Sequence, residues 1–148
     1  MKKFSSETIQ KILIPTDGSD HSIRAAEYAI SIAKVHDAQI MVVYVVDEIV
    51  IDQFSKSAER EAVEAELKND GKRFVNYAVG LAEKEGVKAT SMLVRGRPFE
   101  QVVNIAKGMN IDLIVMGTYG WRGADRILMG SVAERVIEYS PCPVLVVK

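Results

Sequence analysis

The residues best suited to binding a charged ligand lie in one glycine-rich stretch, which reads GTYGWRGADRILMGS over residues 117–131. Two residues separate Gly117 from Gly120, and nine more separate Gly120 from Gly130 and Ser131. Glycine adopts positive φ and lets backbone N–H groups approach a ligand with no side chain between them. Where such a segment leads into a helix, the unpaired N–H groups and the helix dipole favour an anion. The spacing therefore indicates an anion site, and phosphate is the expected group.

A structural interpretation of the same stretch stays open. Glycines in a loop often only permit turns, and Ser131 with Glu134 forms a capping-box pattern that explains Ser131 as a helix cap. The stretch matches neither the P-loop pattern, which needs Gly-Lys before Ser or Thr, nor the GxGxxG dinucleotide pattern. The mechanisms of those two nucleotide-binding folds therefore cannot be transferred to this chain.

The elements that must position this stretch alternate along the chain. Apolar runs rich in β-branched residues predict five strands at Lys11–Pro15, Ala38–Val46, Val87–Val94, Asp112–Met116 and Pro143–Val147. Nearly continuous apolar runs are typical of strands buried on both faces of a parallel sheet. In such open α/β sheets, ligands bind beyond the carboxyl ends of the strands.

Helical periodicity fills the intervals between the predicted strands. Ser19 is a good N-cap for a helix ending near His36, and Pro98 opens a helix that Gly108 ends. The interval from Gln53 to Glu85 also reads as mostly helical, although Asn69–Gly71 weakens its middle. A last helix follows Gly130, stops at Ser140 and Pro141, and is expected to bury Val132, Val136 and Ile137. The pattern predicts a Rossmann-like α/β fold, with residues 1–148 as a single domain.

Several segments together resemble the universal stress protein family. They are KILIPTDGS near the start, VVYVVD, LVRGRPFE, DLIVMGTYG, LMGSVAERVI and the closing SPCPVLVVK. The glycine spacing, completed by Gly117, Gly120, Gly130 and Ser131, is similar to that of the ATP-binding branch of the family. The resemblance covers nearly the whole chain and implies a five-stranded parallel sheet in the order 3-2-1-4-5, with helices on both faces.

The resemblance also implies a ligand and the residues that hold it. The ligand is ATP, with Mg²⁺, and the family commonly assembles as homodimers. Pro15, Thr16 and Asp17 are expected to border the nucleoside, and the backbone of Val45 to meet the adenine. The phosphates are expected at Gly117, Thr118, Gly120, Gly130, Ser131 and Val132.

Two further assignments rest on chemistry. Asp17 can accept hydrogen bonds from ribose hydroxyls or hold Mg²⁺, a hard cation that shares oxygen ligands with phosphates; the alternative is that Asp17 only caps the turn. Arg122 and Arg126 can neutralise phosphate oxygens, and a solvated surface role for each stays open.

Composition excludes several other classes. Nineteen Lys and Arg against twenty Asp and Glu give a net charge of −1, which provides no positive field for nucleic acid. No apolar run approaches the ~18 residues of a membrane span, and Met1–Gln10 does not resemble a signal peptide. Cys142 is the single cysteine, which fits a reducing compartment. The expected location is the cytoplasm, with no nucleic-acid or membrane partner.

The sequence favours binding over turnover, because it shows no Ser-His-Asp arrangement, paired acidic residues or metal-ligand cluster. The leading hypothesis is a nucleotide-responsive stress or regulatory protein with at most slow hydrolysis. A weak ATPase, a phosphoryl or nucleotidyl transferase, and a nucleotide-independent dimeric interaction module remain alternatives. If Pro143–Val147 is an edge strand, its apolar run needs a cover, and we expect antiparallel pairing with a second copy.

Overall fold

The computed structural model describes residues 8–118 and 130–148. Within these residues the elements are, in chain order, β1 (Lys11–Pro15), α1 (Asp20–His36), β2 (Gln39–Asp47), α2 (Glu48–Ile51), α3 (Ser57–Lys84), β3 (Ala89–Gly96), α4 (Pro98–Gly108), β4 (Leu113–Gly117), α5 (Ser131–Tyr139) and β5 (Val144–Val147). The five predicted strands are confirmed, each within two residues of its expected bounds.

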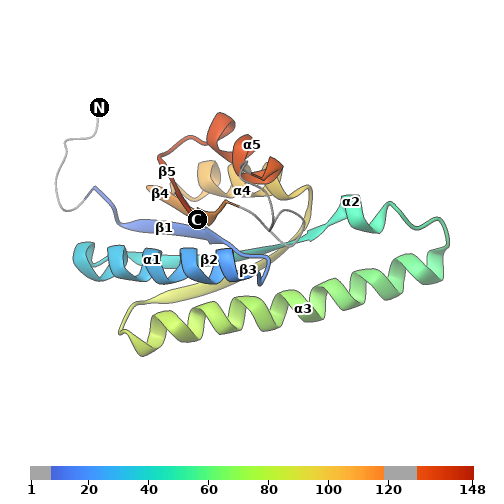
Figure 1. The fold of residues 1–148 in the computed structure, drawn as a ribbon, viewed down its shortest axis with the longest axis horizontal. Coiled ribbons are helices and arrows are strands. Elements are labelled where there is room, and N and C mark those ends of the chain that lie inside the picture. Colours follow the sequence, from blue (N-terminus) through green and yellow to red (C-terminus); the bar gives the residue numbers. More distant parts are fainter. Residues whose placement is uncertain (1–7, 119–129) are drawn as a thin grey trace.

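The strands form one parallel sheet in the order β3-β2-β1-β4-β5 (Figure 1). This is the order that the resemblance implied. Pro15 at the end of β1 aligns with Val43 of β2, and Ile12 aligns with Leu113 of β4. The chain adds β2 and β3 on one side of β1, then β4 and β5 on the other side. The carboxyl ends of β1 and β4 therefore border the switch point at which open α/β sheets bind ligands.

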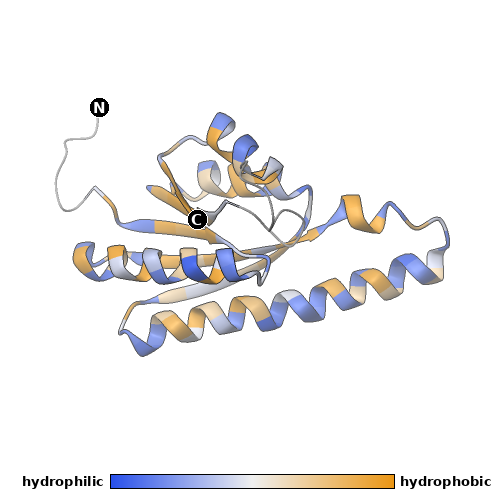
Figure 2. Ribbon diagram, in the orientation of Figure 1, coloured by the Kyte–Doolittle hydropathy of each residue, from blue (hydrophilic) through white to orange (hydrophobic). Residues whose placement is uncertain are grey.

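Helices cover both faces of the sheet. On one face, Ile12 and Ile14 of β1 pack into a core shared with α1 and α3, while Leu13 of the same strand faces α4 and α5. Because β1 is buried on both faces, its apolar residues are consecutive and do not alternate with polar ones. Helices α1 and α3 carry hydrophobic and hydrophilic residues in alternation along their length (Figure 2).

Helix α3 confirms the predicted helix between Gln53 and Glu85 and runs unbroken through Asn69–Gly71. Its 28 residues give a length of about 42 Å, and its N-terminal part extends beyond the sheet (Figure 1). Gly71 lies against the sheet, and a Cβ there would fall 2.7 Å from Leu93 Cδ1 and closer still to Tyr44 Cδ1. Packing against β2 and β3 thus holds this glycine in a helix that local propensity alone would weaken.

Helix α5 also differs from expectation. Its N-cap is Gly130, which makes no side-chain hydrogen bond, so the capping box of Ser131 and Glu134 is not formed. The buried side consists of Ala133 and Val136, whereas Val132 and Ile137 are 37% and 44% exposed. The reason is geometric, because this nine-residue helix packs through one narrow stripe and leaves the flanking apolar side chains in solvent.

The short helix α2 was not expected. Asp47 is its N-cap, and the Asp47 carboxylate accepts a hydrogen bond of 2.9 Å from the Ile49 amide. Arg60 of α3 donates to the carbonyl oxygens of Ile51, the last residue of α2, and of Phe54, which follows α2. A capping aspartate at a strand end was the available signal for α2.

Candidate functional site

The segment after β1 is a turn held by its own hydrogen bonds. The Gly18 amide donates to Thr16 Oγ1 at 3.2 Å, and the Ser19 amide donates to Asp17 Oδ1 at 2.9 Å. Thr16 is buried and donates through Oγ1 to Ser22 Oγ at 3.0 Å. These bonds fix the direction of the Asp17 carboxylate at the carboxyl end of β1.

Ser19 is the N-cap of α1, as the sequence predicted, and its side chain accepts from the Ser22 amide at 3.3 Å. Asp17 is therefore not the residue at the N-cap position, although its Oδ1 serves the turn. This geometry leaves Asp17 at the edge of the sheet, where a carboxylate can accept hydroxyl hydrogen bonds or contribute to a cation site.

The backbone groups of Val45 lie beside the carboxyl end of β1. On β2, the Gln39 amide donates to Gln10 on the β1 side, while the Ile40 amide donates to Lys88 on the β3 side. Backbone groups of odd-numbered residues therefore point toward β1, and the Val43 carbonyl accepts from the Thr16 amide at 2.9 Å. Strand β1 ends at Pro15, opposite Val43. The N–H and C=O of Val45 thus point past the end of β1, as required for hydrogen bonding to a flat heterocycle.

Gly117 ends β4, beside the first turn of α1. A Cβ on Gly117 would lie 2.8 Å from His21 Cβ and 2.9 Å from the His21 backbone carbon. Strand and helix can approach this closely only because residue 117 has no side chain. The structure thus gives Gly117 a packing role, whatever it also contributes to a ligand.

Thr118 and Gly130, the residues on either side of 119–129, are joined by a backbone hydrogen bond. The Gly130 amide donates to the Thr118 carbonyl at 2.8 Å, and the Thr118 amide donates to the Val147 carbonyl at 3.0 Å. These two amides serve the fold and are engaged within the protein. They bring the start of α5 next to the end of β4, close to β1.

The first turn of α5 presents the available donors. The Glu134 amide donates to the Gly130 carbonyl at 3.1 Å, and it is the first amide of α5 with such a bond in the described part of the chain. In the same part of the chain, the amides of Ser131, Val132 and Ala133 make no hydrogen bond. Unpaired N–H groups at a helix N-terminus form a site for phosphate or another anion.

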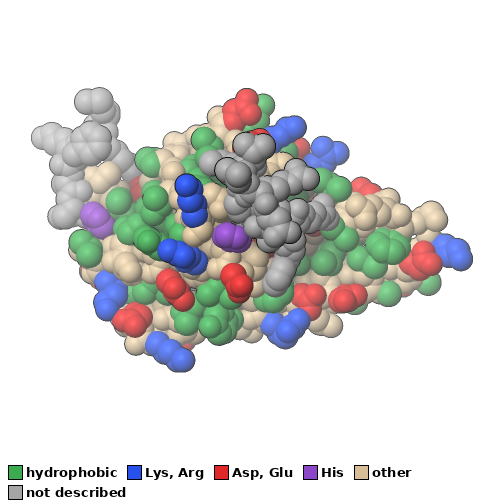
Figure 3. Space-filling model, viewed as in Figure 1, with side chains coloured by type: hydrophobic (Ala, Val, Ile, Leu, Met, Phe, Trp, Pro, Cys, Tyr) green, Lys and Arg blue, Asp and Glu red, His purple; other side chains and the backbone are tan. Residues whose placement is uncertain are grey.

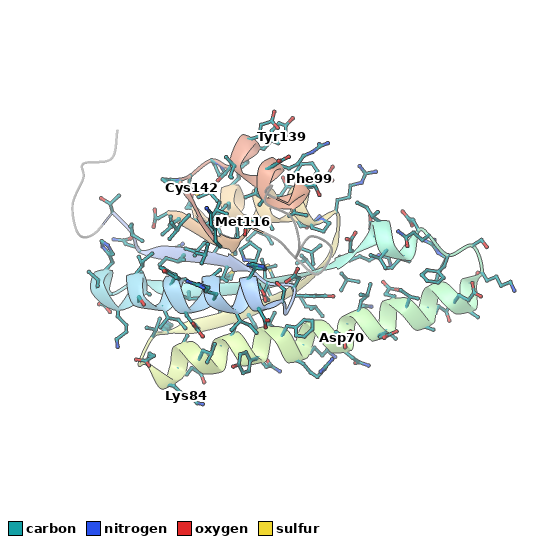
Figure 4. The ribbon with its side chains drawn as sticks, viewed as in Figure 1. Asp70, Lys84, Phe99, Met116, Tyr139 and Cys142 are labelled. Atoms are coloured by element: carbon teal, nitrogen blue, oxygen red, sulfur yellow. The ribbon has the colours of Figure 1, made fainter. Side chains whose placement is uncertain are left out.

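Aromatic packing fixes where α5 sits. Phe99 of α4 and Tyr139 of α5 lie side by side (Figure 4), with ring centroids 6.1 Å apart. The guanidinium of Arg135 lies 5.1 Å from the centroid of the Phe99 ring. The donors of α5 are therefore carried by a helix docked on α4, and their position is set by tertiary contacts.

Gly120, Arg122 and Arg126 lie outside the described residues. Within residues 8–118 and 130–148, no group of three His, Cys, Asp or Glu side chains is placed to hold a metal ion. A cation held by Asp17 would therefore need most of its ligands from a bound phosphate compound or water, which is the usual arrangement for Mg²⁺.

Tyr44 of β2 interacts electrostatically with Asp17, and the sequence analysis did not predict a role for it. It is 7% exposed, near the end of β2, and its ring is tilted at 54° to that of Phe74 with centroids 6.0 Å apart. Burial raises the pKa of the Tyr44 hydroxyl to about 12, and the carboxylates of Asp70, Asp17 and Asp47 add to the shift. Figure 4 labels Asp70 on α3. Tyr44 therefore stays neutral at physiological pH.

A cleft of about 270 Å³ lies between α1 and α3, on the other side of the β1–α1 turn from α5. Its lining comprises Thr16, Gly18, Ser22, Ile23, Ala26, Arg73, Phe74, Tyr77, Ala78 and Leu81. Apolar side chains are exposed on this face of the molecule (Figure 3), and Tyr77 is 56% exposed. Phe74 is a residue of α3 that lines this cleft beside the β1–α1 turn. Its contact with the turn has no signal in the sequence, because the two segments are far apart along the chain.

Several known proteins with similar sequences and folds belong to one family. The universal stress protein family model matches residues 8–148. Universal stress protein MJ0531 of Methanocaldococcus jannaschii is 45% identical over 139 residues, which cover 94% of this chain and 82% of that protein. A solved structure of MJ0577, from the same organism, has a TM-score of 0.84 at 31% identity and covers 95% of this chain and 96% of its own. A universal stress protein solved in complex with cAMP has a TM-score of 0.73 at 26% identity, covering 95% of this chain and 98% of its own.

The fold and the site define an α/β protein in which the ends of β1 and β4 border the switch point of a parallel sheet, with the N-terminus of α5 next to the end of β4. The chain belongs to the universal stress protein family. The family resemblance seen in the sequence is thereby confirmed. Among residues 8–118 and 130–148, no helix has the length and apolar character that a membrane crossing requires.

Proposed function

We propose that this protein binds an adenine nucleotide, ATP with Mg²⁺, at the carboxyl edge of the sheet, and acts as a nucleotide-responsive stress or regulatory protein. The observation that carries the proposal is the set of three amides at Ser131, Val132 and Ala133, which have no partner within the described residues. They lie on the helix next to the ends of β1 and β4 and provide the donors that a phosphate chain requires.

The remaining proposed contacts follow from the positions of the strand ends. The Val45 backbone points past the end of β1 and is proposed to meet an adenine edge, while Pro15 and Thr16 are proposed to border the nucleoside. Asp17 is proposed to contact the ribose or to hold Mg²⁺ together with the phosphates. Gly117, Gly120 and Arg122 complete the proposed phosphate contacts, whereas Thr118 is not proposed, because its amide and its hydroxyl both donate to the Val147 carbonyl. The universal stress protein solved with cAMP, 26% identical to this chain, supports an adenine nucleotide as the ligand.

Substitution of Gly130 tests where the phosphates bind. Gly130 has φ −66° and ψ 153°, the extended conformation that an Asn or Asp N-cap adopts readily. Either side chain would accept a hydrogen bond from an amide in the first turn, and so compete with phosphate. Asp would also add a negative charge. We expect Gly130→Asn and Gly130→Asp to keep or raise the stability of α5, and Asp to weaken ATP binding by more than about tenfold.

Isothermal titration with ATP, with and without Mg²⁺, gives the affinities. Asn and Asp have nearly the same size, so a larger loss with Asp isolates the effect of charge. No heat of binding to the wild-type protein at millimolar ATP would refute nucleotide binding. Wild-type affinity in both variants would instead refute the placement of the phosphates at α5.

We also propose a homodimer formed by antiparallel pairing of β5 with its copy. β5 is an edge strand, and its residues Val144, Leu145 and Val146 are only partly buried. The carbonyls of Pro143 and Val147 accept hydrogen bonds from the β4 side, so the backbone of Val146 faces outward. Val146→Pro removes an outward N–H while keeping the pairing with β4. Sedimentation should show a dimer for the wild type and a monomer for the variant; a wild-type monomer at all concentrations would contradict the proposal.

A cytoplasmic location and a single domain over residues 1–148 complete the proposal. The single cysteine supports a reducing compartment. The family model, which spans residues 8–148, supports one domain.

A further inference from the structure

Phe74 of α3 packs directly on Gly18, in the turn that carries Asp17. Gly18 has φ +79°, and a Cβ built on it would lie 2.5 Å from Cδ1 and Cζ of the Phe74 ring. The ring therefore covers the Gly18 Cα at van der Waals contact. Both the left-handed backbone and the covering ring require glycine at this position.

The Phe74 ring is itself held from two sides. Tyr44 contacts it from β2, with ring centroids 6.0 Å apart. The Arg73 guanidinium carbon lies 5.6 Å from the ring centroid, and Arg73 Nη2 pairs with Asp70 Oδ1 at 2.5 Å. Tyr44 is 7% exposed, so the Phe74 ring packs against a buried side chain of the sheet. Because such a close-packed interior moves little, Phe74 can hold the turn in place.

The turn and Phe74 border the same cleft between α1 and α3. Thr16, Gly18 and Ser22 border the cleft of about 270 Å³, and Phe74 forms part of its wall. Removal of the ring would extend the cleft beneath Gly18. The Ser19 amide holds Asp17 Oδ1 at 2.9 Å, so movement of the turn would redirect the carboxylate.

We infer that Phe74 is a positioning residue for Asp17, through which α3 sets the geometry of the nucleotide site. The inference rests on the proposed function for its ligand. Phe74 contacts the turn at Gly18, and it acts by fixing Gly18 and thereby the carboxylate of Asp17.

The test compares Phe74→Ala and Phe74→Leu, with Tyr77→Ala as the control. Tyr77 lines the same cleft one turn further along α3 and is 56% exposed. Titration with ATP and Mg²⁺ should show about tenfold weaker binding for Phe74→Ala, most of it restored in Phe74→Leu, and wild-type binding for Tyr77→Ala. Circular dichroism verifies that each variant is folded.

A double-mutant cycle separates positioning from general loosening. In an Asp17→Ala background, Phe74→Ala should cause little further loss of affinity, because the carboxylate it positions is absent. An equal fold-loss in both backgrounds would overturn the inference, as would wild-type affinity for Phe74→Ala alone.

Hydrogen exchange in the free protein separates this inference from the proposed function. The Gly18 and Ser19 amides are bonded within the turn, and they should exchange faster in Phe74→Ala than in Tyr77→Ala. If the wild type fails to bind nucleotide, the proposed function fails, and so does the inferred effect of Phe74 on nucleotide binding. Hydrogen exchange would still show whether Phe74 stabilises the turn at Gly18. Unchanged exchange in Phe74→Ala would overturn this stabilisation even if nucleotide binds.

Discussion

Replacing Gly71 with alanine should have two opposite effects on the free energy of unfolding. In a helix interior, Gly→Ala normally stabilises by about 0.5–1 kcal/mol, because glycine loses more conformational freedom on folding than alanine does. At Gly71, however, the added Cβ would fall 2.7 Å from Leu93 Cδ1 and still closer to the Tyr44 ring. Overpacking of this kind costs about 1–3 kcal/mol. The Tyr44 ring is buried and cannot move aside easily, so we expect Gly71→Ala to lower the free energy of unfolding by about 1–2 kcal/mol.

Gly80 provides a matched control on the same helix. A Cβ at Gly80 would meet nothing within 4 Å, so only the propensity effect remains. Gly80→Ala should therefore raise the free energy of unfolding by about 0.5–1 kcal/mol.

Urea unfolding followed by circular dichroism at 222 nm measures both changes. For a chain of this length, each 1 kcal/mol corresponds to about 2–4 °C in Tm, which gives an independent check by thermal unfolding. The opposite signs expected for the two alanines make the comparison insensitive to the exact magnitudes. If Gly71→Ala is as stabilising as Gly80→Ala, the close packing of α3 on β2 and β3 is not present in solution.

Three further predictions concern pH, charge and the end of β4. The pKa of Tyr44 is raised to about 12 in the folded protein. The stability gained by keeping this hydroxyl neutral is fully present below pH ~10, and up to about 3 kcal/mol of the free energy of unfolding is lost as pH rises toward 12. Urea unfolding from pH 9 to 11.5 should show this loss, and Tyr44→Phe should reduce it. Arg95→Gln breaks the pair with Glu64 at 2.6 Å, but the Arg95 side chain is 45% exposed, so the loss in unfolding free energy should be under about 1 kcal/mol and smaller in high salt. A larger, salt-independent loss would show that Arg95 is needed for packing. Gly117→Ala should lower the free energy of unfolding by about 1–3 kcal/mol, because the new Cβ meets the His21 backbone; unchanged Tm would contradict that contact.

Much of the fold could be predicted because its signals are local. Ser19 before a helical stripe marked the start of α1, and Pro98 marked the start of α4, since capping and fixed φ depend on neighbouring residues alone. The same rules misplaced the cap of α5. Ser131 and Glu134 have the right spacing for a capping box, but the helix begins at Ser131, with Gly130 as its cap.

At the site, the residue types that follow the strands are already visible in the sequence: an aspartate after β1, and glycines after β4 and before α5. What each of these groups is available to do depends on contacts between segments far apart in the chain. The amides of Thr118 and Gly130 are engaged within the protein, while Gly117 lies against His21 and Phe74 covers Gly18. The physical reason is range: backbone conformation and capping depend on adjacent residues, whereas the distance between a ring on α3 and a turn after β1 is set by the packing of the whole sheet between its helices.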